Sequence, residues 1–74
     1  MYGILMNKLA IIVTDYDEAL NIREELKKHD LFERLSFDVG RMMYFIYLKP
    51  VNTDNYNELE SLVNTNKYRL VRGY

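Results

Sequence analysis

The segment Arg41 to Pro50, RMMYFIYLKP, constrains the fold most, because it is apolar on both faces if it is extended. Successive side chains of a strand point to opposite faces. One face carries Met42, Tyr44, Ile46 and Leu48, and the other carries Arg41, Met43, Phe45, Tyr47 and Lys49. A small domain has one core, so only one of these faces can meet it. The other face needs a second subunit, another partner or nucleic acid.

The length of the chain makes such a second contact valuable. Its 74 residues form a single domain, 1–74, and a chain of this size buries only about 60% of the surface that its unfolded form exposes. It has no cysteine and one histidine, so disulfides and thiolate metal sites are excluded. The single histidine cannot build a histidine cluster, and we assign no metal ligand and predict no cofactor. Oligomerisation is the common remaining way to bury more apolar surface.

Membrane insertion is not predicted from the sequence. The longest uninterrupted apolar run is Leu9 to Val13, far short of the roughly 20 residues that a spanning helix needs. The start MYGILMNK lacks the charged region and long apolar segment of a signal peptide, so we expect a cytoplasmic protein. Seven Tyr and seven Asn residues favour an AT-rich genome, such as that of a phage or a low-GC bacterium.

The first half of the chain reads as a strand followed by a helix. KLAIIVTDY is rich in β-branched residues and typical of a buried central strand. From Asp17 to about Asp30, the apolar residues Ala19, Ile22 and Leu26 recur at spacings of three and four, which predicts a helix. Asp15, three residues before Glu18, is the predicted cap of that helix.

The second half reads as two strands, a helix and a strand. LFERLSFDVGRMMYFIYLK predicts a hairpin that turns at DVGR around Gly40 and ends before Pro50. Thr53 or Asn52 is expected to cap a helix through about Thr65. The apolar stripe of that helix is Tyr56, Leu59, Leu62 and Val63, and Asn66 suits the position after it. KYRLVRGY closes the chain as a strand, with Tyr68 and Leu70 inward and Lys67, Arg69 and Val71 outward.

The order strand, helix, strand, strand, helix, strand predicts an α+β domain with the split βαβ arrangement of the ferredoxin-like fold. In that fold a four-stranded antiparallel sheet has both helices on one face. Met42, Tyr44, Ile46 and Leu48 would pack under the helices. The other face would carry Met43, Phe45 and Tyr47, joined by Ala10, Ile12 and Thr14.

Charge is segregated between the predicted helices and strands. Residues 15–33 hold seven acids and three bases, and residues 50–66 hold three acids and no base. The predicted strands are basic, and strand parity directs Arg34, Arg41, Lys49, Lys67 and Arg69 to the face opposite the helices. A basic sheet with exposed aromatic residues favours an acidic partner: RNA, single-stranded DNA or an acidic protein surface.

The third predicted long strand resembles the corresponding strand of the RNA-recognition motif, which carries basic and aromatic residues in a fixed order. RMMYFIYL keeps Arg41, Phe45 and Ile46 in register and departs at Met42, Met43 and Leu48. The first strand, LAIIVT, lacks the aromatic residue that would stack a second base. This resemblance implies single-stranded nucleic-acid binding, RNA in particular, as an alternative function.

Acidic residues also follow the first predicted strand, in TDYDE. Asp15, Asp17 and Glu18 at a strand end are where carboxylates could hold Mg²⁺ for phosphodiester chemistry. The same residue types are favoured at a helix start for capping. A magnesium-dependent small nuclease is therefore a third, less favoured function.

The sequence marks no catalytic set, so we predict a non-enzymatic binding module. It is expected to form a homodimer or to dock on a larger protein with an acidic surface, as a regulator or inhibitor that a phage or mobile element could encode. The predicted binding face consists of aromatic, apolar and basic residues: Ile12, Arg41, Met43, Phe45, Tyr47, Lys49, Lys67 and Arg69.

Overall fold

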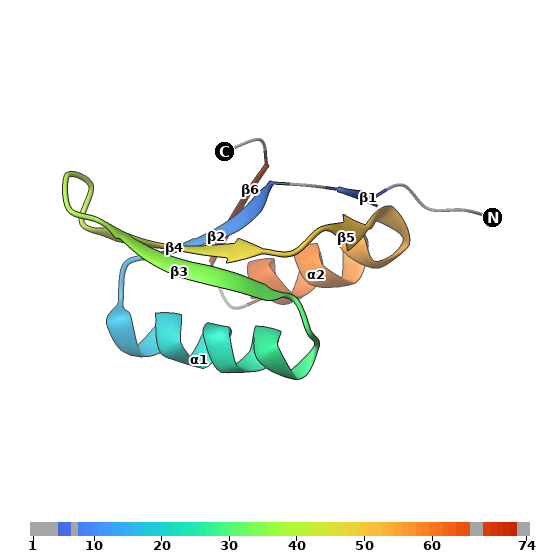
Figure 1. The fold of residues 1–74 in the computed structure, drawn as a ribbon, viewed down its shortest axis with the longest axis horizontal. Helices are drawn as coiled ribbons and strands as arrows, with labels where there is room; N and C mark the ends of the chain where they lie inside the picture. The colour runs from blue at the N-terminus through green and yellow to red at the C-terminus, as the bar shows by residue number, and fades with distance from the viewer. Residues whose placement is uncertain (1–4, 7, 66–67, 73–74) are drawn as a thin grey trace.

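The computed structural model describes residues 5–6, 8–65 and 68–72 of the chain. The described residues form two helices and six strands (Figure 1). In chain order these are β1 (Leu5–Met6), β2 (Leu9–Val13), α1 (Tyr16–Lys28), β3 (Phe32–Asp38), β4 (Met43–Leu48), β5 (Val51–Asn52), α2 (Thr53–Thr65) and β6 (Arg69–Arg72).

Four of the strands form an antiparallel sheet in the order β3-β4-β2-β6. The central strand β2 pairs with β4, from Leu9 opposite Leu48 to Val13 opposite Tyr44. On its other side β2 pairs with β6, where Ile11 lies opposite Leu70. The predicted α+β class, four-stranded antiparallel sheet and two helices are confirmed.

Two short strands, β1 and β5, were not predicted, so the element order differs from the six-element order expected. They pair antiparallel with each other, with Met6 opposite Val51. Lys8 has a left-handed backbone (φ 57) and separates β1 from β2. Pro50 has no amide proton to donate and lies between β4 and β5. These two breaks leave a separate two-stranded ladder at one end of the sheet (Figure 1).

Helix α1 begins as its sequence predicts. The side chain of Asp15 accepts a hydrogen bond from the Glu18 backbone amide at 3.0 Å, which satisfies an otherwise unpaired donor of the first turn. Ala19, Ile22 and Leu26 are the buried residues of the helix. The helix ends at Lys28, slightly before the predicted end.

Helix α2 spans Thr53–Thr65, and Asn52 precedes it. The Asn52 side chain accepts a hydrogen bond from the Asp54 amide at 2.8 Å, so Asn52 provides the predicted cap. Leu59 and Val63 are buried as predicted. Leu62, which was predicted to belong to the same apolar stripe, is 47% exposed and lies outside the core. The predicted role of Asn66 lies outside the described residues.

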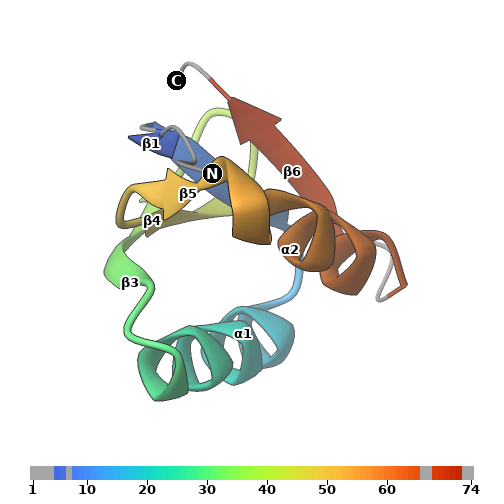
Figure 2. The same ribbon diagram turned by 90° about the vertical axis from the view of Figure 1, so that its right-hand side faces the viewer.

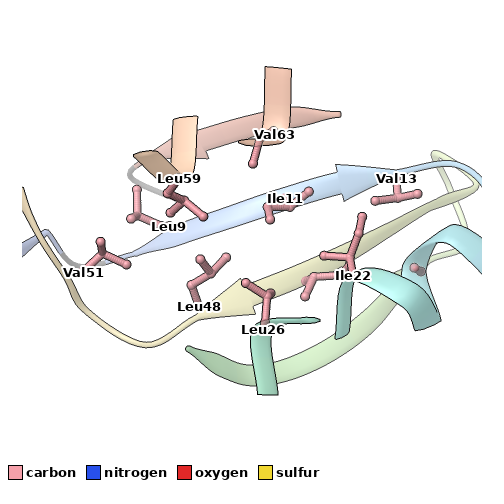
Figure 3. Packing of buried hydrophobic residues seen from close by; sticks show 11 residues of the cluster. Leu9, Ile11, Val13, Ile22, Leu26, Leu48, Val51, Leu59 and Val63 are labelled. Carbon is pink, nitrogen blue, oxygen red and sulfur yellow. The ribbon is translucent and has the colours of Figure 1, made fainter. Parts of the chain in front are cut away.

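One hydrophobic core joins both helices to the sheet. Along β2, the alternating residues Leu9, Ile11 and Val13 are all buried. They form a single cluster with side chains of α1 and α2. In the view of Figure 3, Leu59 and Val63 of α2 lie above β2, and Ile22 and Leu26 of α1 lie below it. Figure 2 shows the two helices lying on the same side of the sheet. The cluster consists of Leu9, Ile11, Val13, Ala19, Ile22, Leu26, Ile46, Leu48, Val51, Leu59 and Val63.

The hairpin between β3 and β4 extends past the start of α1 (Figure 1). Its turn, residues 39–42, contains Gly40 as predicted. However, Met42 takes the left-handed conformation (φ 55) and is 64% exposed, so the prediction that it packs under the helices is wrong. Val39 is also in the turn and is 73% exposed. Both residues therefore belong to a turn that lies beyond the start of α1 (Figure 1).

Candidate functional site

The sheet face, defined here as the side of the four-stranded sheet opposite the helices, carries two ordered rows of side chains. In the first row, Tyr47 of β4 lies between Arg34 of β3 and Ala10 of β2. Val71 of β6 lies beyond Ala10. Because cross-strand partners point to the same side of a sheet, these four side chains form a continuous strip.

The second row runs parallel to the first. Phe45 of β4 lies between Ser36 of β3 and Ile12 of β2, and Arg69 of β6 lies beyond Ile12. Met43 continues the same parity toward the hairpin, opposite Asp38. The structure therefore brings Ile12, Met43, Phe45, Tyr47 and Arg69 of the predicted binding face onto one surface.

Ring contacts order the centre of this surface. The Tyr47 and Phe45 rings are stacked, with centroids 6.2 Å apart and planes 22° apart. The Arg34 guanidinium carbon lies 4.2 Å from the Tyr47 ring centroid, within the range of a cation–π contact. Ala10 beside Tyr47 is completely buried. The central side chains are thus held in place by one another.

The distribution of polarity across the strands resembles that of a protein interface. Arg34 and Arg69 stand on β3 and β6, the two edge strands. Phe45, Tyr47 and Ile12 stand on the central strands β4 and β2 and are partly buried. An apolar, aromatic centre with a charged rim is the usual anatomy of a protein–protein contact.

Arg41, another predicted binding residue, is not part of the two rows. It lies in the hairpin turn, where its backbone amide donates to the Asp38 carboxylate at 3.2 Å. Its Nε is 3.8 Å from the other Asp38 oxygen. Arg41 therefore neutralises Asp38 at the hairpin end, and the predicted parity fails because β4 starts only at Met43.

Lys49, also predicted, pairs with the loop that follows α1. Its Nζ donates to Asp30 Oδ1 at 2.7 Å, and its backbone amide donates to the Leu31 carbonyl. The hydrogen bond and then the charge of Lys49 lower the pKa of Asp30 below its ordinary value. Strand parity does not apply at Lys49 because β4 ends at Leu48.

The remaining basic residues near the C-terminus do not all lie on the same side of the sheet. Lys67, the last of the predicted binding residues, lies outside the described residues. Arg72 is paired with Leu9 in the sheet, and its guanidinium carbon lies 5.5 Å from the ring centroid of Tyr56 in α2. Arg72 therefore belongs to the helix side, whereas Arg69 belongs to the sheet face.

Five residues of the sheet face were missing from the predicted binding set: Ala10, Arg34, Ser36, Asp38 and Val71. Arg34 and Val71 both have the strand parity that points to this face. Arg34 was not included in the predicted binding set, although it lies over the ring of Tyr47. A contact between residues of neighbouring strands depends on the register in which β3 and β4 pair. The bulge between Phe32 and Arg34 conceals that register in the sequence.

The acids after β2 act at the start of the helix. Asp15 is occupied as the cap of α1. Burial, followed by the charges of Glu18 and Asp15, raises the pKa of Tyr68, the residue that precedes β6. Among residues 5–6, 8–65 and 68–72 there is no group of three His, Cys, Asp or Glu side chains that could hold a metal ion.

Comparisons with known proteins found no matching family model, no matching curated protein and no matching solved structure. In the described part of the chain, neither helix combines the length and apolar composition that a membrane span requires.

Proposed function

We propose that this chain is a small non-enzymatic binding module that forms a homodimer through its sheet face. The main observation that supports this proposal is the cluster of Arg34, Tyr47 and Phe45, which lies on the side of the sheet opposite the helices. Burying such a preformed aromatic surface costs little side-chain entropy. A chain this small, without disulfides, also gains stability by burying that surface.

The arrangement of the long strands supports a ferredoxin-like assignment within this proposal. If the short β1–β5 ladder is set aside, β2 is the first long strand and β4 is the third, and they are antiparallel neighbours at the centre of the sheet. The remaining long strands, β3 and β6, occupy the edges. That order is expected of a split βαβ unit duplicated around one sheet.

The positions of the two rim arginines are compatible with pairing two copies. Arg34 and Arg69 both stand on edge strands, so long side chains can keep their charges in water while the centre is buried. A larger protein with an acidic surface would meet the same rim more favourably. That second form of the proposal suits a regulator or inhibitor of a larger enzyme, including one that a phage or mobile element encodes.

Single-stranded nucleic-acid binding is the second candidate, because the face combines stacked rings with arginines. Arg34 weakens this candidate, since its guanidinium already lies over the Tyr47 ring where a base would have to stack. Anisotropy of a labelled RNA oligonucleotide tests it. Binding that falls steeply with salt and is lost in Phe45→Ala would favour nucleic acid over the dimer.

A matched pair of tyrosine substitutions tests the dimer. Tyr47→Glu removes the central ring of the sheet face and should produce a folded monomer, because aromatic contact area is lost and burying a carboxylate is costly even beside Arg34. Tyr16→Glu makes the same change at an exposed position on the first turn of α1, where an acid is favourable, and should remain dimeric. Sedimentation equilibrium gives the masses, and circular dichroism checks folding. An unchanged dimer in Tyr47→Glu would refute the proposed interface.

A further inference from the structure

The helix side of the molecule contains a groove between α1 and α2. Two adjoining cavities, of about 280 Å³ and about 630 Å³, share the lining residues His29, Leu31, Leu59 and Leu62. Since they share these residues, they form one depression, which we call the helix groove. Its volume is in the range of cavities that hold ligands or side chains of a partner.

Each wall of the helix groove is one stripe of a helix. On α1, Ile22, Leu26 and the capping residue His29 line the groove at spacings of four and three. On α2, Asn55, Leu59 and Leu62 line it at the same spacings. Residues at these spacings share a helix face, so each wall is regular. Figure 2 shows the two helices on the same side of the sheet.

The floor of the helix groove is apolar and its rim is acidic. Ile11 of β2 and Val63 of α2 lie at the bottom and belong to the core (Figure 3). Glu25 and Glu58 line the two cavities. Within the described residues Glu58 takes part in no ion pair, whereas Glu25 lies 3.6 Å from Lys28. Of the three acids of α2, Glu58 lines the groove, so the α2 wall carries a negative charge.

We infer that the helix groove binds an amphipathic peptide segment whose apolar side chains are flanked by Lys or Arg. Leu62, 47% exposed at the junction of the two cavities, offers apolar area for such a segment. Glu58 offers an opposite charge to its basic residues. An amphipathic helix laid in an apolar groove is a common mode of peptide recognition. This inference does not depend on the dimer, because the helix groove and the sheet face lie on opposite sides of the sheet.

Fluorescence anisotropy with a labelled synthetic amphipathic peptide of Leu and Lys tests this inference. The full chain should bind it with one peptide per chain, and a matched peptide with Glu in place of Lys should not bind. Glu58→Lys should weaken binding about fivefold, and Leu62→Gln about tenfold through lost apolar burial. Glu33→Lys makes the same charge reversal, and Val39→Gln a similar apolar-to-polar change, at exposed positions outside the groove; both should leave binding unchanged.

Several results would overturn the inference. Equal binding of both peptides, binding of neither, or equal losses in Glu58→Lys and Glu33→Lys would exclude a specific groove for a basic peptide. Loss of peptide binding in Tyr47→Glu would move the site to the sheet face. Loss of self-association in Leu62→Gln would identify a second copy as the occupant. By contrast, a monomeric Tyr47→Glu that still binds the peptide separates this site from the proposed dimer interface.

Discussion

The guanidinium of Arg34 lies over the ring of Tyr47, with 4.2 Å between the guanidinium carbon and the ring centroid. The two residues are cross-strand partners on β3 and β4, so the contact ties the edge strand to the centre of the sheet face. An exposed cation–π contact is worth about 0.5–1 kcal/mol. Arg34→Ala should therefore lower the free energy of unfolding by about that amount.

Urea unfolding at fixed protein concentration measures the effect of Arg34→Ala. Arg69→Ala is the control, because it removes an exposed arginine from the other edge strand, where no ring contact with Arg69 occurs among the described residues. Equal losses in the two variants would mean that the Arg34–Tyr47 contact contributes nothing specific.

The Asp30–Lys49 pair should make stability depend on pH. Because Lys49 lowers the pKa of Asp30 in the folded chain, the pair stabilises the fold above the ordinary Asp pKa. That contribution is lost as the pH falls through the lower folded value. The urea midpoint of Lys49→Met should thus lie below that of the unsubstituted chain at about pH 7, and the difference should fade below about pH 4. A difference that persists unchanged in acid would contradict this assignment.

Asp15 should act as a helix cap and not as a metal ligand. Its carboxylate accepts from the Glu18 amide, so Asp15→Ala should destabilise the chain by about 1 kcal/mol, while Asp15→Asn should be nearly neutral. Thermal unfolding with and without Mg²⁺ tests both statements. Magnesium-dependent stabilisation that disappears in Asp15→Asn would favour the nuclease hypothesis instead.

Met42 should be replaceable by glycine with a gain in stability. Its φ of 55 is unfavourable for a residue with a side chain, and its side chain is mostly exposed, so little packing is lost. Met42→Gly should raise the free energy of unfolding by up to about 1 kcal/mol. Val39→Gly, in the same turn but without a left-handed backbone, should not stabilise the chain. Urea unfolding of both variants shows whether the gain depends on the left-handed conformation of Met42. An equal gain in both variants would mean that the hairpin turn is stabilised by glycine at either position, and would contradict this explanation.

Much of the helix structure could be predicted from the sequence, because local signals determine it. Asp15 and Asn52 are residue types that commonly cap helices. The spacing of Ile22 and Leu26 identifies the buried face of α1, and that of Leu59 and Val63 identifies the buried face of α2. The β1–β5 ladder could not be predicted, because a strand of two residues shows no periodicity and the two strands are far apart in the sequence. The exposure of Met42 depends on where the helices end relative to the hairpin.

The candidate site was predictable only where strand parity holds. Ile12, Met43, Phe45, Tyr47 and Arg69 lie inside strands, and parity places them correctly on the sheet face. Their role in binding remains a prediction.

Parity fails outside the strands. Arg41 and Lys49 lie just outside the ends of β4, where turn geometry and ion pairs with Asp38 and Asp30 determine the side-chain position. The Arg34 contact depends on a bulge in β3, which has no distinct sequence signal here.

The oligomeric state of the unsubstituted chain tests the central claim most directly. Light scattering across the size-exclusion peak, over about a tenfold range of loading concentration, gives the mass without a reference standard. The proposed interface predicts twice the chain mass of 8.9 kDa at every concentration, or a dimer that dissociates on dilution. A mass of one chain throughout would contradict self-association through the sheet face.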